Sequence, residues 1–512
     1  MSTLFASTLF ADTLFADTLQ GPSVDWFSVS PLLVLLGGAL VLLLVASLTP
    51  AWPKHWYALV AATFALGASV MSVLLWHQID KEGSTTLIGD ALVLDKPAVW
   101  IAITICVAVF LCALVTDDYL RREGIDEPEL YALYLLAALG GIVMAAANDL
   151  IVLFLGLEIL SIALYVMAAS HRKRAESQES GIKYFVLGSF SSAFFLYGIA
   201  LIYGGAGSTN FNKMVAALEP TTGSDRTNDA LVLAGIALLL VGLAFKVAAV
   251  PFHFWVPDVY QGAPTPVTAF MASAGKAAAF GAMLRVLLEA LPNWSDDYRP
   301  AVWGIAVLTL VGGSVMAVVQ TNVKRMLAFS SVSHAGFILV GVEAAAHRPG
   351  APMGGDGVSS VLLYLLIYAV MVIGTFAVVT AVGRTGDAAT DLAGFRGLAK
   401  HKPTLALAMT VLLLAQAGVP LTSGFIAKFG VITAAVDAHS YAIAIVAMVS
   451  AVIAAFVYLR IMVSMWITEE EASDATREAV RVPVLLWATI ATSAAFTIAV
   501  GLFPGWLINI TP

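Results

Sequence analysis

The sequence predicts an all-α polytopic membrane protein with about fourteen transmembrane helices. Of its 512 residues, 60% are hydrophobic and only 12% are charged, and the mean hydropathy is +0.90, which lies well outside the usage of soluble domains. A helix that crosses about 30 Å of hydrocarbon needs roughly 20 apolar residues, and such segments recur from Ser30 to the C-terminus. A transmembrane barrel would instead need short strands of alternating hydrophobicity.

Apolar runs separated by polar breaks define the expected helices one after another. The seventh run leads into Pro251 and Pro257, and the twelfth contains Gly418 and Pro420. Because proline removes a backbone donor and clashes with the preceding turn, we expect helices 7 and 12 to be broken where they face protein or water. The expected spans are 30–48, 56–76, 97–115, 130–147, 150–169, 178–203, 230–250, 265–291, 300–320, 323–345, 358–383, 403–438, 440–466 and 483–503.

The basic residues divide the connecting loops into two sets. Fourteen lysines and arginines fall in the loops after spans 1, 3, 5, 9, 11 and 13, and six fall in the opposite loops. The positive-inside rule therefore places the first set in the cytoplasm and both termini on the outer side of the membrane. Arg285 and Arg460 lie near the ends of spans, where we expect them to snorkel to the headgroups. The first set comprises Lys54, Arg121, Arg122, Arg172, Lys173, Arg174, Lys324, Arg325, Arg384, Arg396, Lys400, Lys402, Arg477 and Arg481, and the second comprises Lys81, Lys96, Lys213, Arg226, Arg299 and Arg348.

Two five-helix units, spans 4–8 and spans 9–13, are expected to form an inverted repeat. Asn148 opens span 5 as Asn322 opens span 10, and the breaks at Pro251 and Pro420 recur at nearly the same offset. Since spans 5 and 10 start on opposite sides, the two units are inverted, an arrangement typical of transporters. The expected divisions are a tail at 1–29, helices 1–3 at 30–129, the first unit at 130–291, the second at 300–466, and a cytoplasmic loop with helix 14 at 467–512.

Composition also excludes several kinds of site. Cys106 and Cys112 lie in one apolar span and are too few for a cysteine-ligated iron–sulfur cluster, and no Gly-rich phosphate loop follows a strand. A net charge of −8 offers no basic face to a nucleic acid. The TLFA repeats of the first twenty residues lack a basic n-region, so we expect a tail and not a signal peptide. Any redox chemistry must reside on another subunit.

Ionisable side chains inside apolar spans are the candidate functional residues. Glu158 lies halfway along span 5, and Lys246 lies five residues before the break in span 7. A buried charge costs at least a few kcal/mol, so we expect the two to pair and to exchange protonation states. A fixed ion pair that only locks helices together is the alternative.

Further candidates are distributed over the later spans. Lys276 lies midway along span 8 among small residues, Lys428 follows the second break, and Lys183 lies about two turns into span 6 on the cytoplasmic side. His253 at the first break and His334 in span 10 titrate near neutral pH and can relay protons. Burial disfavours the charged form of lysine, which makes proton release accessible.

The sequence around these candidates resembles a known family. The segments that carry the resemblance are GLEILSIALYVM, GIKYFVLGSFSSAFFLYG, FKVAAVPFHFWVPDVYQGAPTPVTAFMASAGKAAAF, TNVKRMLAFSSVSHAGF and AGVPLTSGFIAKF. They closely resemble subunit N of bacterial NADH:quinone oxidoreductase, respiratory complex I, a family of antiporter-like membrane subunits. The segment VPDVYQGAPTPVTAF resembles subunit N more than its paralogues L and M, and the lysine at position 428 argues against subunit M.

The resemblance implies a proton-translocating subunit. It places the family's relay residues on Glu158, Lys183, Lys246, Lys276 and Lys428, with protonation changes passed from the quinone end and release outward from the last. It also implies that NADH, FMN, iron–sulfur clusters and quinone belong to other subunits. The expected partners are protons, lipid and the neighbouring antiporter-like and small membrane subunits.

Two other functions remain open from the sequence alone. A subunit of a multi-subunit cation/proton antiporter or membrane hydrogenase would share the broken helices and lysines, and the identity of neighbouring genes would distinguish it. A structural spacer would use the charges for packing only. In that case replacing Lys246 would lower assembly but leave pumping per electron intact.

Overall fold

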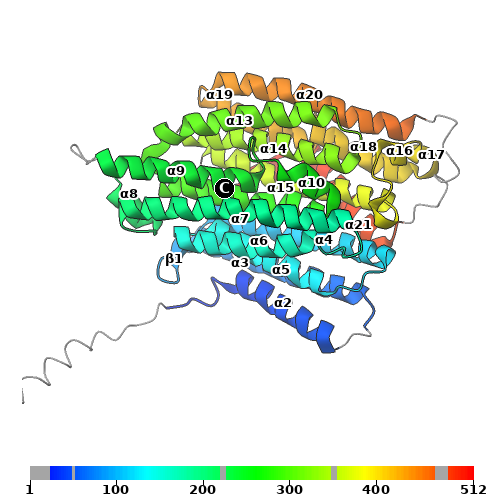
Figure 1. Ribbon diagram of the computed structural model, residues 1–512, viewed down its shortest axis with the longest axis horizontal. Coiled ribbons are helices and arrows are strands. Elements are labelled where there is room, and N and C mark those ends of the chain that lie inside the picture. The colour runs from blue at the N-terminus through cyan, green and yellow to red at the C-terminus, as the bar shows by residue number, and fades with distance from the viewer. Residues whose placement is uncertain (1–22, 49–51, 219–225, 348–354, 468–481) are drawn as a thin grey trace, which may run out of the picture.

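The computed structural model describes residues 23–48, 52–218, 226–347, 355–467 and 482–512, and its long helices run side by side in one bundle (Figure 1). Within these ranges, thirteen helices are long and apolar enough to cross a membrane. A further span is divided into the half-helices α18 and α19, so the prediction of about fourteen spans is confirmed. The TLFA repeats, Arg348, Arg477 and Arg481 lie outside the described residues.

The elements follow one another with short connections. In chain order they are α2 (Ser30–Leu48), α3 (His55–Glu82), β1 (Thr85–Leu87), β2 (Leu92–Leu94), α4 (Lys96–Glu123), α5 (Glu129–Ala146), α6 (Leu150–Ala168), α7 (Ala175–Ala206), α8 (Phe211–Ala217), α9 (Arg226–Val247), α10 (Trp255–Gly262), α11 (Thr265–Phe270), η1 (Met271–Gly275), α12 (Lys276–Leu284), η2 (Arg285–Ala290), η3 (Pro292–Trp294), α13 (Ser295–Val318), α14 (Val323–Ala346), α15 (Asp356–Val382), η4 (Thr385–Asp387), α16 (Leu392–Phe395), α17 (Leu398–His401), α18 (Pro403–Ala417), α19 (Ser423–Asp437), α20 (Tyr441–Trp466), α21 (Val484–Leu502) and α22 (Gly505–Ile508).

Both expected breaks are present. The seventh span stops at Val247 and resumes as α10, and the twelfth stops at Ala417 and resumes at Ser423. The eighth span, predicted as one helix, instead alternates between α-helical and π-helical turns over α11, η1, α12 and η2. Such turns add a residue to the helical ladder without changing the apolar pattern, so hydropathy does not reveal them.

One connection is a β-hairpin that the all-α prediction did not include. β1 pairs antiparallel with β2, and the turn between them contains Ile88, Gly89 and Asp90, all at positive φ. Glycine and aspartate tolerate this left-handed conformation in tight turns. The hairpin lies at the end of the bundle that also holds α8 (left in Figure 1).

The other end of the bundle, which we call the basic end, holds the loop Arg172–Arg174 together with α16 and α17 (right in Figure 1). We placed Arg121 and Arg122 in a loop after span 3, which is wrong, because α4 continues to Glu123 and contains them in its last turn. Likewise Lys324 lies inside the first turn of α14. Hydropathy detects only the apolar part of a helix, so polar end turns were counted as loop.

Arg285 does not snorkel to the membrane surface, which corrects our expectation. Its side chain is 2% exposed, and its Nη2 lies 2.5 Å from Asp95 Oδ1 while its Nε donates to Ala145 O at 2.9 Å. Arg460 also turns inward, donating to the carbonyls of Val318 and Gln320 at 2.9 Å. Both guanidinium groups therefore bind protein acceptors and hold helix ends together.

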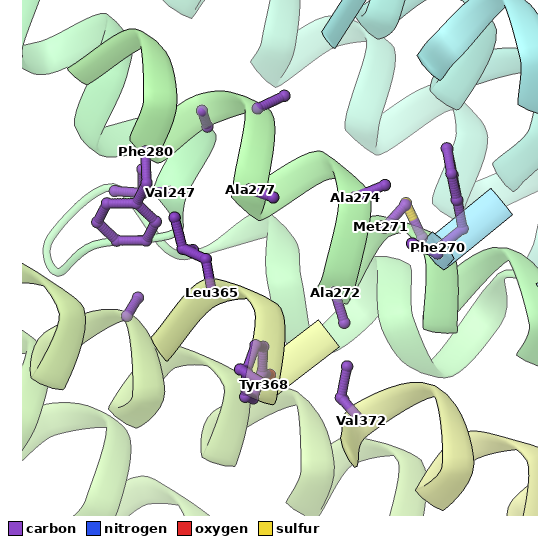
Figure 2. Packing of buried hydrophobic residues seen from close by; sticks show 14 of the residues in the cluster. Val247, Phe270, Met271, Ala272, Ala274, Ala277, Phe280, Leu365, Tyr368 and Val372 are labelled. Carbon is purple, nitrogen blue, oxygen red and sulfur yellow. The ribbon is translucent and has the colours of Figure 1, made fainter. Parts of the chain in front are cut away.

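Small residues bring the eighth span close to its neighbours. Ala272 of η1 points between Tyr368 and Val372 of α15, and Ala277 lies along the same helix (Figure 2). Close packing of small side chains is the usual way in which helices associate in membranes, where burial of apolar surface gives no net gain between helices. This contact places Lys276 in the centre of the bundle.

Replacement of Gly156 with alanine is expected to destabilise the bundle by about 1–3 kcal/mol, because overpacking forces backbone shifts. A Cβ at this position would lie 2.8 Å from Gly140 O and 2.9 Å from Met144 N, so α5 and α6 would have to separate. The amount of folded, detergent-solubilised subunit that remains on native gels after heating measures the effect. Gly37→Ala, with no heavy atom within 4 Å of the added Cβ, is the matched control, and equal losses in both variants would contradict the prediction.

Candidate functional site

Lys246 lies in the last turn of α9, immediately before the break in the seventh span, and is buried. Its Nζ donates a hydrogen bond to Ser161 Oγ at 2.6 Å and lies 3.5 Å from Tyr165 OH, both on α6. The ring of Tyr184 lies 5.9 Å from the same ammonium. The lysine therefore meets hydroxyl groups and aromatic faces, which interact with a cation without forming a permanent ion pair.

Glu158 is half-buried in the middle of α6, and its Oε1 accepts a hydrogen bond from Ser192 Oγ of α7 at 2.5 Å. The expected direct ion pair with Lys246 is wrong, since no carboxylate of the described residues lies within 4.0 Å of that lysine. Glu158 points towards α7, whereas Ser161, three residues further along the helix, meets the lysine. Glu158 still acts on Lys246 electrostatically, so the two are coupled without contact.

Lys276 begins α12 directly after the π-helical segment Met271–Gly275. It is 1% exposed, and its Nζ donates to the carbonyl of Ser331 in α14. The ring of Tyr368 lies 5.8 Å away. In the part of the chain that the structure describes, this ammonium also has no carboxylate partner. Its positive charge is thus held by a carbonyl and an aromatic face in a buried position, where it is costly.

His334 of α14 lies between two tyrosine hydroxyls. Its Nδ1 is 2.6 Å from Tyr364 OH and its Nε2 is 3.2 Å from Tyr458 OH. The hydroxyl of Tyr458 also lies 2.5 Å from Ser330 Oγ. A neutral imidazole donates from one nitrogen and accepts at the other, so a proton can cross this row of groups while the ring exchanges its tautomer.

Lys428 lies in α19, one turn after the second break. Its Nζ turns back to donate to the carbonyls of Gln416 at 2.8 Å and Ala417 at 3.0 Å, at the C-terminal end of α18. A half-helix C-terminus carries partial negative charge, and this stabilises a cation there. The charges of Lys428 and Lys276 both act on His334. The imidazole is therefore electrostatically coupled to both lysines.

Lys183 is separate from this buried row. Its side chain is 40% exposed and bonds to Glu179 at 2.7 Å and Asp258 at 2.8 Å. Arg325 also binds Asp258, at 2.8 Å, so Asp258 anchors α10 to α7 and α14. Lys183, Glu179 and Asp258 line a pocket of about 570 Å³ at the basic end.

His253 lies in the break between α9 and α10 and is half-buried. Its ring lies 5.3 Å from that of Phe254 and 6.3 Å from that of Phe329. Among the described residues, His334 is hydrogen-bonded to two tyrosine hydroxyls, whereas His253 has no side-chain hydrogen bond to such a group. The structure therefore places His334, but not His253, in a row of hydroxyl groups.

A buried charge cluster at the basic end was missed by the sequence analysis. The carboxylate of Asp387 lies 3.1 Å from Lys324, 3.0 Å from Arg174 and 3.7 Å from Arg122. Burial alone would raise the pKa of Asp387, but the three basic groups together hold it below its usual value. These residues come from four separate parts of the chain, so no spacing pattern connects them. The one available signal was the presence of two aspartates, Asp387 and Asp391, in an otherwise basic loop.

A second missed group lies towards the opposite end of α14. The carboxylate of Glu343 is buried, lies 2.8 Å from His347 Nε2 and accepts a hydrogen bond from Ser440 Oγ at 3.1 Å. The spacing of four residues on one helix face could have indicated the contact between the two side chains. This carboxylate–imidazole pair lies beside Ser440, just after the end of α19.

Comparison with known proteins places these features in context. The family model described as NADH:quinone oxidoreductase/Mrp antiporter, TM, matches residues 147–454. The chain is 47% identical over 398 residues to NADH-quinone oxidoreductase subunit N 3 of Streptomyces griseus, covering 76% of this chain and 70% of the relative. It is 40% identical over 530 residues to subunit N of Mycobacterium tuberculosis, covering 94% and 96%. Its fold matches a chain of respiratory complex I from Thermus thermophilus with bound aureothin at a TM-score of 0.76 and 30% identity, covering 94% and 98%.

Proposed function

The chain belongs to the NADH:quinone oxidoreductase/Mrp antiporter family of transmembrane subunits, and from this premise we propose that it is the N-type proton-translocating subunit of a bacterial NADH-quinone oxidoreductase. Relatives that match nearly its whole length are named subunit N of that enzyme. The chain is then one subunit of a translocase and works with other membrane subunits of complex I. NADH, FMN, iron–sulfur clusters and quinone are assigned to the remaining subunits.

One observation carries the proposal. Lys246, Lys276 and Lys428 are all buried in the bundle, and each ammonium meets hydroxyls or carbonyls where a structural lysine would meet a carboxylate. A permanently charged lysine in such a place costs free energy and gives little stability in return. A lysine that alternates between neutral and charged forms suits a relay, because the cost of its charge is what drives the proton onward.

The arrangement suggests an order for the transfer. A proton reaches Lys246 from the basic end, passes to Lys276 and crosses to Lys428 by way of His334. Changes in the charge of Glu158 alter the proton affinity of Lys246 without contact, which allows a distant reaction to drive the step. We retain Lys183 and His253 as members of the relay on its cytoplasmic side.

We further propose that the two five-helix units, 130–291 and 300–466, form an inverted repeat. In both, the start of the second helix exchanges two backbone hydrogen bonds with the segment after the third helix. The pairs are Leu150–Thr209 and Phe211–Asn148 in the first unit, and Val323–Thr390 and Leu392–Thr321 in the second. The first exchange lies beside α8 and the second beside α16, at opposite ends of the bundle (Figure 1). This likeness supports inversion. The divisions at 1–29, 30–129 and 467–512 are retained as part of the proposal.

The basic end is assigned to the cytoplasm of a bacterium, with both termini outside the inner membrane, on the strength of the loop charges. A cation/proton antiporter or a membrane hydrogenase is not favoured, because curated relatives at 40% identity over 94% of the chain are named subunit N. A structural spacer is distinguished from a proton-translocating subunit by the Glu158→Gln variant.

Replacement of Glu158 with glutamine is expected to leave the enzyme assembled but to lower proton translocation per NADH and quinone reductase rate several-fold. Glutamine keeps the hydrogen bond to Ser192 and removes only the charge that acts on Lys246. The measurement is proton uptake and NADH oxidation in membrane vesicles, with assembly followed on native gels.

Glu82→Gln provides the matched control, since this residue lies at the exposed end of α3 and its side-chain hydrogen bond within the described ranges is the one it accepts from Gln78. The control should pump normally. If Glu158→Gln pumps as many protons per NADH as the control, the charge serves packing alone and the spacer reading is correct.

A further inference from the structure

A second pocket lies at the basic end between α5, α6 and α7. It measures about 580 Å³, and its rim carries Glu127, Glu129 and Arg172. Its walls are apolar, and its lining includes Tyr165, one turn inside the end of α6. It therefore has two properties expected of a proton inlet, a mouth with charged side chains at the basic end and a tyrosine among its lining residues.

Tyr165 connects this pocket to the buried row. The residue lines the cavity, and its hydroxyl lies 3.5 Å from Lys246 Nζ. A tyrosine hydroxyl both donates and accepts, so a water in the pocket can pass a proton through it to a neutral lysine while the hydroxyl proton is replaced. Ser161 bonds the same ammonium at 2.6 Å on the side of Glu158. Lys246 thus lies between the pocket and Glu158, whose charge we propose controls its proton affinity.

The mouth of the pocket is suited to collecting protons. Glu127 lies in the loop before α5 with a side chain 21% exposed, and Arg172 Nε lies 3.1 Å from its carboxylate. Burial raises the pKa of Glu127, and nearby Glu129 adds to this, although Arg172 and His171 oppose it. A carboxylate that keeps its proton closer to neutral pH is a better acceptor from the cytoplasm than an ordinary surface glutamate.

The neighbouring pocket, which contains Lys183, lacks such a connection. There the ammonium lies between Glu179 and Asp258. No hydrogen bond given for the described residues runs from that cluster to Lys246. The two pockets open on different faces of α7, since Ile182 lines one and Lys183 the other.

We propose that the pocket rimmed by Glu127 and Arg172 is the cytoplasmic proton inlet of this subunit and that Tyr165 delivers the proton to Lys246. The inference rests on the proposed function and identifies where its relay begins. Atoms balance because each transfer moves one proton from water to hydroxyl to amine and returns the hydroxyl to its starting form.

A blocking experiment tests the inlet in the assembled enzyme. Ser170 lines the pocket, so Ser170→Cys introduces a thiol there, while Cys106 and Cys112 are buried and do not compete. Inside-out membrane vesicles expose this face to a bulky, membrane-impermeant maleimide. We expect labelling to lower proton pumping and NADH oxidation by at least about tenfold, because removal of a proton-transfer route has effects of this size.

Lys400→Cys is the matched control, because Lys400 is exposed at the basic end and lines neither pocket. Labelling at position 400 should leave pumping unchanged. Glu176→Cys, at a 68% exposed residue of the Lys183 pocket, tests the alternative entrance. If labelling at position 176 blocks the enzyme and labelling at 170 does not, protons enter beside Lys183 and the inference is overturned, although the proposed function stands. Full activity with both labels also overturns it.

Tyr165→Phe separates delivery from packing, because the ring contacts remain and only the hydroxyl is lost. We expect slower turnover with a larger solvent deuterium isotope effect, as proton delivery becomes rate-limiting. Tyr197→Phe, on an exposed tyrosine of α7, should change neither. An unchanged isotope effect in Tyr165→Phe contradicts the role of its hydroxyl, whereas normal pumping in Glu158→Gln would contradict the proposed function itself.

Discussion

Replacement of Lys276 with methionine is expected to reduce quinone reduction and proton pumping by at least about tenfold while the subunit remains assembled. Methionine has a similar length and removes a buried charge that no described carboxylate balances. Loss of such a charge is neutral or favourable for stability, so a loss of activity reports function. NADH oxidation with a soluble quinone and native gels of the same membranes measure both quantities.

Lys276→Arg distinguishes a relay from a fixed counter-charge. Arginine keeps the positive charge but does not release its proton at physiological pH. If the ammonium only balanced the field of its surroundings, the arginine variant would retain activity. We expect it to be as inactive as Lys276→Met, and an active arginine variant would refute the relay role.

Replacement of Asp387 with asparagine is expected to be the most destabilising of these changes, at about 3–5 kcal/mol, because it leaves the buried Lys324 without a counter-charge. Lys324 is 0% exposed and would lose its only carboxylate among the described residues, and Arg174 and Arg122 would lose the same partner. We expect little subunit in the assembled complex. Quantitative blotting of native gels measures this.

The sign of the pH dependence at Asp387 follows from its lowered pKa. The folded state favours the ionised form of the Asp387 carboxylate. The stability that this carboxylate contributes is therefore present above the usual carboxylate pKa and is lost as pH falls through the lowered value. Asp391→Asn, on an exposed neighbour in the same loop, should have little effect. Adding Lys324→Met to Asp387→Asn should restore part of the assembly, and failure to do so would argue against charge imbalance as the cause.

The spans, the two breaks and the depth of the lysines could be predicted from the sequence because the membrane imposes them. Hydrocarbon requires continuous apolar helices, and proline within one forces a break that protein must cover. Lys246 and Lys428 were therefore recognisable beside their breaks from residue order alone. Their depth follows from the helical rise.

The contacts of these side chains could not be predicted, because they depend on rotation about each helix. Glu158 and Lys246 lie at similar depth, yet the glutamate faces α7 and the lysine meets Ser161. Arg285 pairs with Asp95, 190 positions away, where proximity to a helix end had suggested the membrane surface. Hydropathy carries no information about such long-range partners.

Proton translocation per NADH in vesicles that contain Lys246→Ala enzyme tests the central claim most directly. We propose that protons pass through this chain along its buried lysines. The assembled variant should therefore translocate fewer protons for each NADH oxidised than the parent enzyme. An assembled Lys246→Ala enzyme with the parent's full ratio would contradict the account.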